Sequence, residues 1–170
     1  MKKTILSLIL ALTFVFLCAI PVSADSIVAP NERYTMISNE DGSTVYLFSD
    51  GSKLTIGPIV VTEPREQYAE RGIRYADLSA DYQDANGNRE WLYTLSATFA
   101  FQYGISSSCL TASYSQTIYV NDWTFSNGSA THTGAVARGL GKFVRKLLFI
   151  TLNDIDIDIS MTCDMYGNVT

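Results

Sequence analysis

The chain is poor in the residue types that build metal centres and nucleophilic active sites. Its 170 residues include one histidine, His132, and three cysteines. A structural zinc site takes four ligands, mostly cysteine and histidine, so a zinc centre is poorly supplied. A Ser-His-Asp site needs a histidine beside its nucleophile, and no elbow motif surrounds any serine. We therefore expect no cofactor, and the sequence singles out no catalytic residue.

Basic residues are also few. The chain has 12 lysines and arginines against 17 aspartates and glutamates, which gives a net charge of −5. Proteins that bind nucleic acid through its phosphates need a basic surface. We therefore expect no nucleic-acid partner.

Long apolar runs are absent beyond the N-terminus. Lys2 and Lys3 make a basic start, residues 4–20 form an uncharged apolar run, and small residues up to Ala24 make a cleavage site. This layout predicts a secretory signal peptide over residues 1–24. We expect a secreted, extracellular protein, free or held at the cell envelope, that meets a membrane only through this segment before cleavage.

Two cysteines follow the predicted signal peptide, Cys109 and Cys163. An even number of cysteines in an exported chain indicates one disulfide bond. Two free thiols in a reducing compartment are the alternative.

What the chain has in abundance is alternation of apolar and polar residues with a period of two, which is typical of β-strands. Residues 44–48 and 53–56 flank a turn cluster and predict a hairpin. Further strands are expected over 74–83, 91–101 and 109–120, with a tight turn at 84–88. The charged stretch 62–71 fits either one or two helical turns or a solvated loop.

The expected strands of the last third are separated by turn residues. A turn at 127–129 precedes a strand over 131–138, which ends at the glycine-rich residues 139–141. Two more strands, 142–152 and 155–163, are expected to join at Asn153-Asp154. The apolar part of the first, 143–152, is predicted to be a buried strand.

Short strands with almost no helical pattern predict an all-β fold, an antiparallel β-sandwich that is immunoglobulin-like in its general architecture. Residues 25–72 are expected to form an N-terminal segment with the hairpin and the short helix or loop. Residues 73–170 are expected to form the β-sandwich domain.

The second half of the chain carries a linked order of residues that resembles a known group. The order is Asn86-Gly87, Trp91, the alternating residues to Phe101, Cys109, Tyr119, Trp123, Gly134, Cys163-Asp164 and Gly167-Asn168. It is similar to a group of uncharacterised small secreted β-rich proteins of Gram-positive, often gut-dwelling, bacteria, over about residues 73–170. The resemblance implies export, a β-rich domain and the Cys109–Cys163 pair, and it implies no activity.

Three acidic residues, Asp154, Asp156 and Asp158, are weak candidates for calcium ligands, because calcium takes several oxygen ligands. Alternate residues on one strand face are about 6.6 Å apart, so one ion reaches two of them only if the side chains lean together. The alternative is a solvated sheet face opposite Arg145 or Lys146.

Aromatic residues are plentiful, with 10 tyrosines and 2 tryptophans. Exposed tyrosine and tryptophan offer flat, amphipathic surfaces for protein or sugar partners. Trp123, Tyr119 and Tyr103 are the candidate ligand-binding residues, and core packing is the alternative for each aromatic.

These observations predict a non-catalytic extracellular binding module whose partner is a protein or a glycan. One alternative is a small secreted hydrolase built around His132, which is otherwise a surface histidine on a strand. A second is a secreted antagonistic factor.

Overall fold

The computed structural model describes residues 33–62 and 71–170, which form ten β-strands and no helix. The predicted signal peptide lies outside these ranges, as does most of the stretch expected to be a short helix or a loop. Among the described residues no helix has the length and apolar character needed to cross a membrane.

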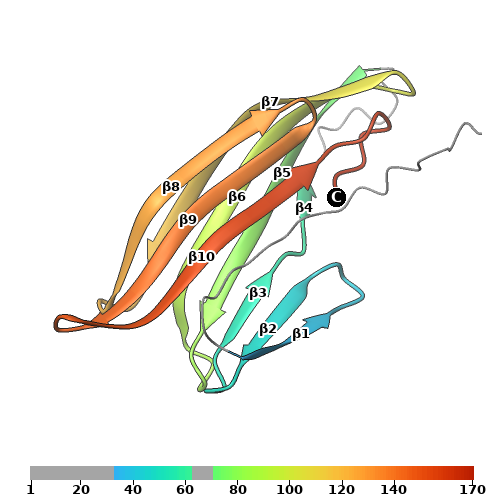
Figure 1. Cartoon of the computed structure of the whole chain (residues 1–170). Coiled ribbons are helices and arrows are strands. Elements are labelled where there is room, and N and C mark those ends of the chain that lie inside the picture. Colours follow the sequence, from blue (N-terminus) through green and yellow to red (C-terminus); the bar gives the residue numbers. More distant parts are fainter. Residues whose placement is uncertain (1–32, 63–70) are drawn as a thin grey trace, which may run out of the picture.

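The larger sheet has seven antiparallel strands in the order β1-β2-β3-β5-β6-β7, with β4 also paired to β5 (Figure 1). Their bounds are β1 (Tyr34–Ser38), β2 (Thr44–Phe48), β3 (Lys53–Ile56), β4 (Val60–Thr62), β5 (Arg71–Gln83), β6 (Arg89–Gln102) and β7 (Ser106–Ile118). The strands of the predicted N-terminal segment therefore belong to the same sheet as β5, β6 and β7.

The smaller sheet has three antiparallel strands in the order β10-β9-β8. They are β8 (Trp123–Thr133), β9 (Val136–Leu147) and β10 (Ile150–Thr162). The all-β, antiparallel prediction is confirmed. Apart from β3 with β5, each pairing within the described residues joins strands that follow one another in the chain, so the Greek-key connection of immunoglobulin domains is not found there.

The two sheets share one apolar core, which the alternation in the sequence supplies. Every second residue of β6 from Trp91 to Phe101 is buried, and every second residue of β10 from Ile155 to Met161 is buried too. The ring of Trp91 stacks on that of Phe143 of β9 with centroids 3.9 Å apart. The inward faces predicted for these two strands are confirmed.

Two predicted turns are confirmed, and three predicted breaks between strands are wrong. Gly51 and Gly87 adopt positive φ in the expected turns after β2 and β5. Residues 127–129 form a bulge inside β8 rather than a turn. Residues 139–141 lie inside β9 instead of ending a strand, because the two glycines there make room for aromatic rings of the core. A Cβ atom on Gly141 would lie 2.5 Å from Cε2 of Phe125.

The last hairpin also differs from its prediction. The turn falls at Leu148 and Phe149, and Asn153-Asp154 lies within β10 beside an irregularity in its pairing with β9. The actual turn consists of apolar residues, whereas the prediction relied on the usual turn residues Asn153 and Asp154. The stretch 143–152, predicted to be buried, is exposed from Lys146 onward.

Candidate functional site

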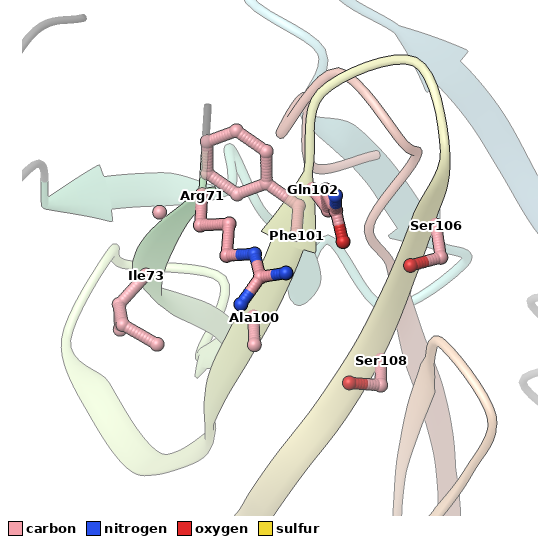
Figure 2. A pocket seen from close by; sticks show the side chains of 8 residues that line it. Arg71, Ile73, Ala100, Phe101, Gln102, Ser106 and Ser108 are labelled. Carbon is pink, nitrogen blue, oxygen red and sulfur yellow. The ribbon is translucent and has the colours of Figure 1, made fainter. Parts of the chain in front are cut away.

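A hollow of about 450 Å³ lies where β5 begins and β6 ends, against the start of β7. The side chains of Arg71, Gln102, Ser106 and Ser108 surround it, together with Ile73, Ala100 and Phe101 (Figure 2). The three strands end close together here because β5, β6 and β7 are consecutive neighbours in the large sheet.

The strand register places the polar residues in rows. Arg71 is opposite Gln102, which is opposite Ser106 on its other side. Two residues further along, Ala100 is opposite Ser108. Residues two apart on a strand point to the same face, so the two rows form one patch on the face of the sheet that looks away from the core.

Phe101 lies between Ala100 and Gln102 on β6, so its ring points to the opposite, core side of the sheet, where it is held on three sides. A Cβ atom on Gly72 would lie 2.5 Å from its ring, and one on Gly167 would lie 2.8 Å from it. The guanidinium of Arg74 sits over the same ring, 4.8 Å from the centroid. The Arg74 Nε–H also donates a hydrogen bond to the Gly167 carbonyl at 3.3 Å, which ties the C-terminal turn to β5.

An exposed aromatic pair lies at the turn that follows Gln102, although neither ring lines the hollow. Tyr103 follows Gln102 in the turn between β6 and β7, and its ring meets that of Tyr166 edge to face with centroids 5.1 Å apart. Tyr103 is 63% exposed and Tyr166 is also exposed. The Gly104 amide donates to the Met165 carbonyl at 3.1 Å, so the two turns that carry the rings are joined by their backbones.

The C-terminal turn is fixed by Asp164. Its Oδ1 accepts hydrogen bonds from the backbone amides of Tyr166 and Asn168, and its Oδ2 accepts one from the Asn168 side chain at 2.8 Å. Burial raises the pKa of the Asp164 carboxyl, but the hydrogen bonds from Asn168 and Tyr166 together outweigh it, so this pKa lies below its ordinary value. The ionised carboxylate therefore holds Tyr166 in place at neutral pH.

The chemistry of the hollow is that of a hydrogen-bonding site for an anion. Among the described residues that line it, only Arg71 is charged. Its guanidinium has five N–H donors in a fork that matches a carboxylate. The Gln102 amide and the serine hydroxyls can both donate and accept. None of these lining groups is a general base placed against a nucleophile.

Of the three aromatic candidates named from the sequence, Tyr103 is the one that follows a residue of the hollow, Gln102, and its own side chain does not line the hollow. Tyr119 is exposed but follows β7 at its far end, roughly 40 Å from Tyr103 at the ordinary rise per residue of a strand. The structure therefore does not bring these two tyrosines together. The residues that line the hollow were missed because their proximity depends on the strand register, which alternation alone does not reveal.

Trp123 is buried in the core with 3% of its surface exposed, so it does not offer the exposed ring expected of a ligand contact. Its Nε1–H donates a 2.8 Å hydrogen bond to Oε2 of the buried Glu90. Arg145 lies 3.5 Å from the other oxygen of Glu90 and makes a 2.7 Å hydrogen bond to Asp122. This polar network explains how a tryptophan after a turn becomes a core residue.

The three aspartates on β10 each face a cation of β9. Lys142 Nζ lies 2.6 Å from Asp154 and 3.3 Å from Asp156, and Arg138 pairs with Asp158. Hydrogen bonding to Asp154 raises the pKa of the Lys142 ammonium. The partners are thus Lys142 and Arg138 rather than the expected Arg145 or Lys146. No cluster of three metal-ligating residues occurs in the described parts of the chain.

His132 is exposed on β8 opposite Ala137. Within residues 33–62 and 71–170 its imidazole makes no hydrogen bond or ion pair. The carboxylate that a hydrolase would place beside this histidine is therefore not found in the described structure.

Cys109 and Cys163 are both buried and carry free thiols in this structure. The Cys109 amide donates to the Gly134 carbonyl at 2.7 Å and the Cys163 amide donates to the Ala135 carbonyl at 3.1 Å. Both cysteines are therefore held by their backbone amides at the same turn between β8 and β9. Burial raises the pKa of both thiols, and the Cys109 thiol adds a small upward shift to that of Cys163.

Comparison of the chain with protein-family models, with curated proteins and with solved structures gives no match. The resemblance to small secreted proteins of Gram-positive bacteria therefore stays a prediction.

Proposed function

We propose that the protein is an extracellular binding module that recognises an acidic glycan at the hollow between β5, β6 and β7. The observation that carries this proposal is one cationic side chain, Arg71, set among neutral hydrogen-bonding groups and beside an exposed tyrosine pair. A sugar acid carries a carboxylate, several hydroxyls and flat C–H faces. Each of these three features has a matching group at the site.

The match can be followed group by group. The Arg71 guanidinium can hold the sugar carboxylate through two parallel hydrogen bonds, which gives both strength and orientation. Gln102 and the two serines can exchange hydrogen bonds with hydroxyls, since each can donate and accept. Tyr103 offers a flat apolar face with a polar tip at the rim. The backbone hydrogen bond from Gly104 to Met165 fixes the turn that carries this ring before a ligand arrives.

The other parts of the proposal concern how the module is made and where it works. Residues 1–24 act as a signal peptide, and the two facing sheets form a β-sandwich that needs no ligand to fold. Cys109 and Cys163 are oxidised to a disulfide outside the cell, with the two electrons passing to a thiol–disulfide oxidant. Their attachment to one turn through backbone hydrogen bonds supports this pairing.

The binding site is tested by calorimetric titration of the purified protein with matched sugars. Sialyllactose is compared with lactose, and a short oligogalacturonate with a neutral oligogalactoside of equal length. We expect at least one acidic sugar to bind and its neutral counterpart to bind at least tenfold more weakly, because a charged hydrogen-bonded pair is worth about 1.5–3 kcal/mol.

The variants for this titration separate the site from the rest of the surface. Arg71→Gln removes the charge and is expected to abolish the preference for the acidic sugar, and Tyr103→Ala is expected to weaken binding of both sugars. Tyr119→Ala is the control, because it removes another exposed tyrosine, far from the hollow. Equal affinities of Arg71→Gln and the unchanged protein for the acidic sugar would refute the site.

A further inference from the structure

The turn between β9 and β10 exposes an unusual amount of apolar surface. The two residues of the turn, Leu148 and Phe149, are 85% and 100% exposed, and their neighbours Leu147, Ile150 and Leu152 are exposed as well. Scattered exposed apolar residues are ordinary, but a contiguous apolar patch indicates an interaction site. Nothing in the described structure covers this turn.

The backbone of the turn adds a second, independent observation. Leu148 has a φ of 56°, a left-handed conformation that is costly for a leucine. Two-residue hairpin turns normally contain Asn-Gly or Asp-Gly, which adopt this conformation easily. The chain therefore places an unfavourable residue here, and both turn side chains point into solvent, so no packing within the molecule compensates for it.

The shape of the region limits what it can contact. Leu147 pairs with Ile150, whereas β8 starts at Trp123, which pairs with Arg145. The end of the β9–β10 hairpin therefore projects beyond the smaller sheet, as Figure 1 shows at the orange-red turn. It is a narrow convex tip rather than a groove. The turn and the rows behind it extend roughly 7–10 Å at the rise of a strand, the depth to which interfacial segments enter a bilayer.

The charges around the tip point to an anionic surface. No carboxylate occurs from Lys146 to Asn153. The nearest acidic side chains are already paired, Asp122 with Arg145 and Asp154 with Lys142. Lys146 lies one residue behind the apolar tip, is exposed, and makes no ion pair within the described structure. An apolar tip followed by an unpaired cation matches acyl chains below phosphate headgroups.

We propose that the hairpin tip, residues 146–152, inserts into the surface of a lipid bilayer that carries anionic headgroups. Leu148 and Phe149 enter the acyl boundary, and Lys146 contacts the phosphates. This contact is separate from the predicted signal peptide, and it departs from the expectation that the protein meets a membrane only before cleavage. It does not depend on the proposed glycan site, which lies at the opposite end of β9 and β10.

The test is binding to vesicles of phosphatidylglycerol and phosphatidylcholine, compared with phosphatidylcholine alone. Leu148→Asn/Phe149→Gly replaces the apolar turn with a favoured turn sequence, so it removes the tip without endangering the hairpin. We expect this variant to lower the vesicle-bound fraction about tenfold or more, since burial of two large apolar side chains is lost. Leu110→Thr, which removes an exposed leucine from β7, is expected to bind like the unchanged protein.

Two further variants separate the parts of the proposal. Lys146→Gln is expected to weaken binding to the anionic vesicles only. Phe149→Trp places an indole at the tip, and its emission is expected to shift to the blue and to be quenched by brominated acyl chains. The difference in emission between this variant and the unchanged protein reports the tip itself, because the buried Trp91 and Trp123 are common to both. An indole that stays in water with both vesicle types would overturn the proposal. So would a tip-dependent dimer in sedimentation equilibrium without vesicle binding, which would make the tip an interface between copies.

Discussion

At the scale of single residues, burial decides which of the aromatic side chains are available for binding. Trp123 and Tyr103 both lie next to turns in the sequence, and composition alone does not separate them. The hydrogen bond to Glu90 and the rings of Tyr82 and Trp91 hold Trp123 in the core. Tyr103 instead lies in the turn between β6 and β7, where it is 63% exposed and meets the ring of Tyr166 in an edge-to-face contact. The sequence pattern identifies both residues as candidates for ligand binding. Their contacts in the structure show that Trp123 belongs to the core and that Tyr103 is exposed.

Glycine at position 141 is required by close packing. A Cβ atom there would lie 2.5 Å from Cε2 and 2.8 Å from Cζ of Phe125. We expect Gly141→Ala to lower the free energy of unfolding by about 1–3 kcal/mol, the usual cost of overpacking. Chemical denaturation measures this. The cost is expected to shrink when Phe125→Leu removes the ring atoms, because the two sites share one contact. Strictly additive effects of the two changes would contradict this packing.

The cysteine pair makes a prediction about the exported protein. We expect its intact mass to be lower by two hydrogens than that of the reduced chain, and neither thiol to be alkylated in denaturant. The labelling must be done in denaturant because burial raises the pKa of both thiols and slows their reaction in the folded state. Reduction is expected to lower stability by about 4 kcal/mol at most, the entropy of a loop of roughly 50 residues. Two labelled cysteines would show that the pair stays reduced.

At the scale of elements, the sequence predicts strands better than it predicts the connections between them. Trp91 and Ile155 begin alternations that the structure reproduces residue by residue, since a buried face leaves one possible phase. The predicted turns were wrong where residues typical of turns have another structural role. Asn127 lies in a bulge of β8, and Gly141 leaves room for the ring of Phe125. The real turn at Leu148 lacks turn chemistry altogether, so no local rule could have located it.

The hollow illustrates a different limit of sequence reading. Arg71 and Ser106 are 35 positions apart in the sequence. They lie in one cross-strand row because both are opposite Gln102 of β6, which pairs with β5 on one side and β7 on the other. Knowledge of which residues face each other across β5, β6 and β7 would have found the site. The alternation pattern gives the face of each residue but not its cross-strand neighbour.

The C-terminal turn is expected to respond to acid through Asp164. Its pKa is lower in the folded protein than in the unfolded chain, whose ordinary value is about 3.9. Because the folded pKa is the lower one, the unfolded state binds more protons than the folded state between the two pKa values. The stabilisation of the fold by the ionised Asp164 is therefore complete above about pH 5 and is lost as pH falls through the folded pKa.

Asp164→Asn tests this effect, because the amide keeps the shape of the side chain without its titration. Its Nδ2 group also cannot accept the hydrogen bond from the Asn168 side chain. We expect the unchanged protein to be more stable than the variant at pH 7 and the difference to shrink toward pH 2. Thermal unfolding at a series of pH values measures it. A difference that stays constant across this range would contradict a role for the ionised carboxylate.

At the scale of the whole molecule, two exposed features occupy opposite ends of the long strands. The tyrosine rim and hollow lie at the turn between β6 and β7, and the apolar tip lies at the turn between β9 and β10 (Figure 1). A molecule held by the tip would present the hollow away from the bilayer. The core that joins the ends contains stacked rings such as Trp91 and Phe143, so both features stand on one packed body.

The central claim is that an acidic sugar binds between β5, β6 and β7, and an amide NMR titration with such a sugar tests it most directly. We expect the largest saturable shifts at Arg71, Gln102, Tyr103, Ser106 and Ser108, with the amides around Tyr119 and Phe149 unchanged. Saturable shifts confined to another region, or no shifts with any of the acidic sugars, would contradict the account.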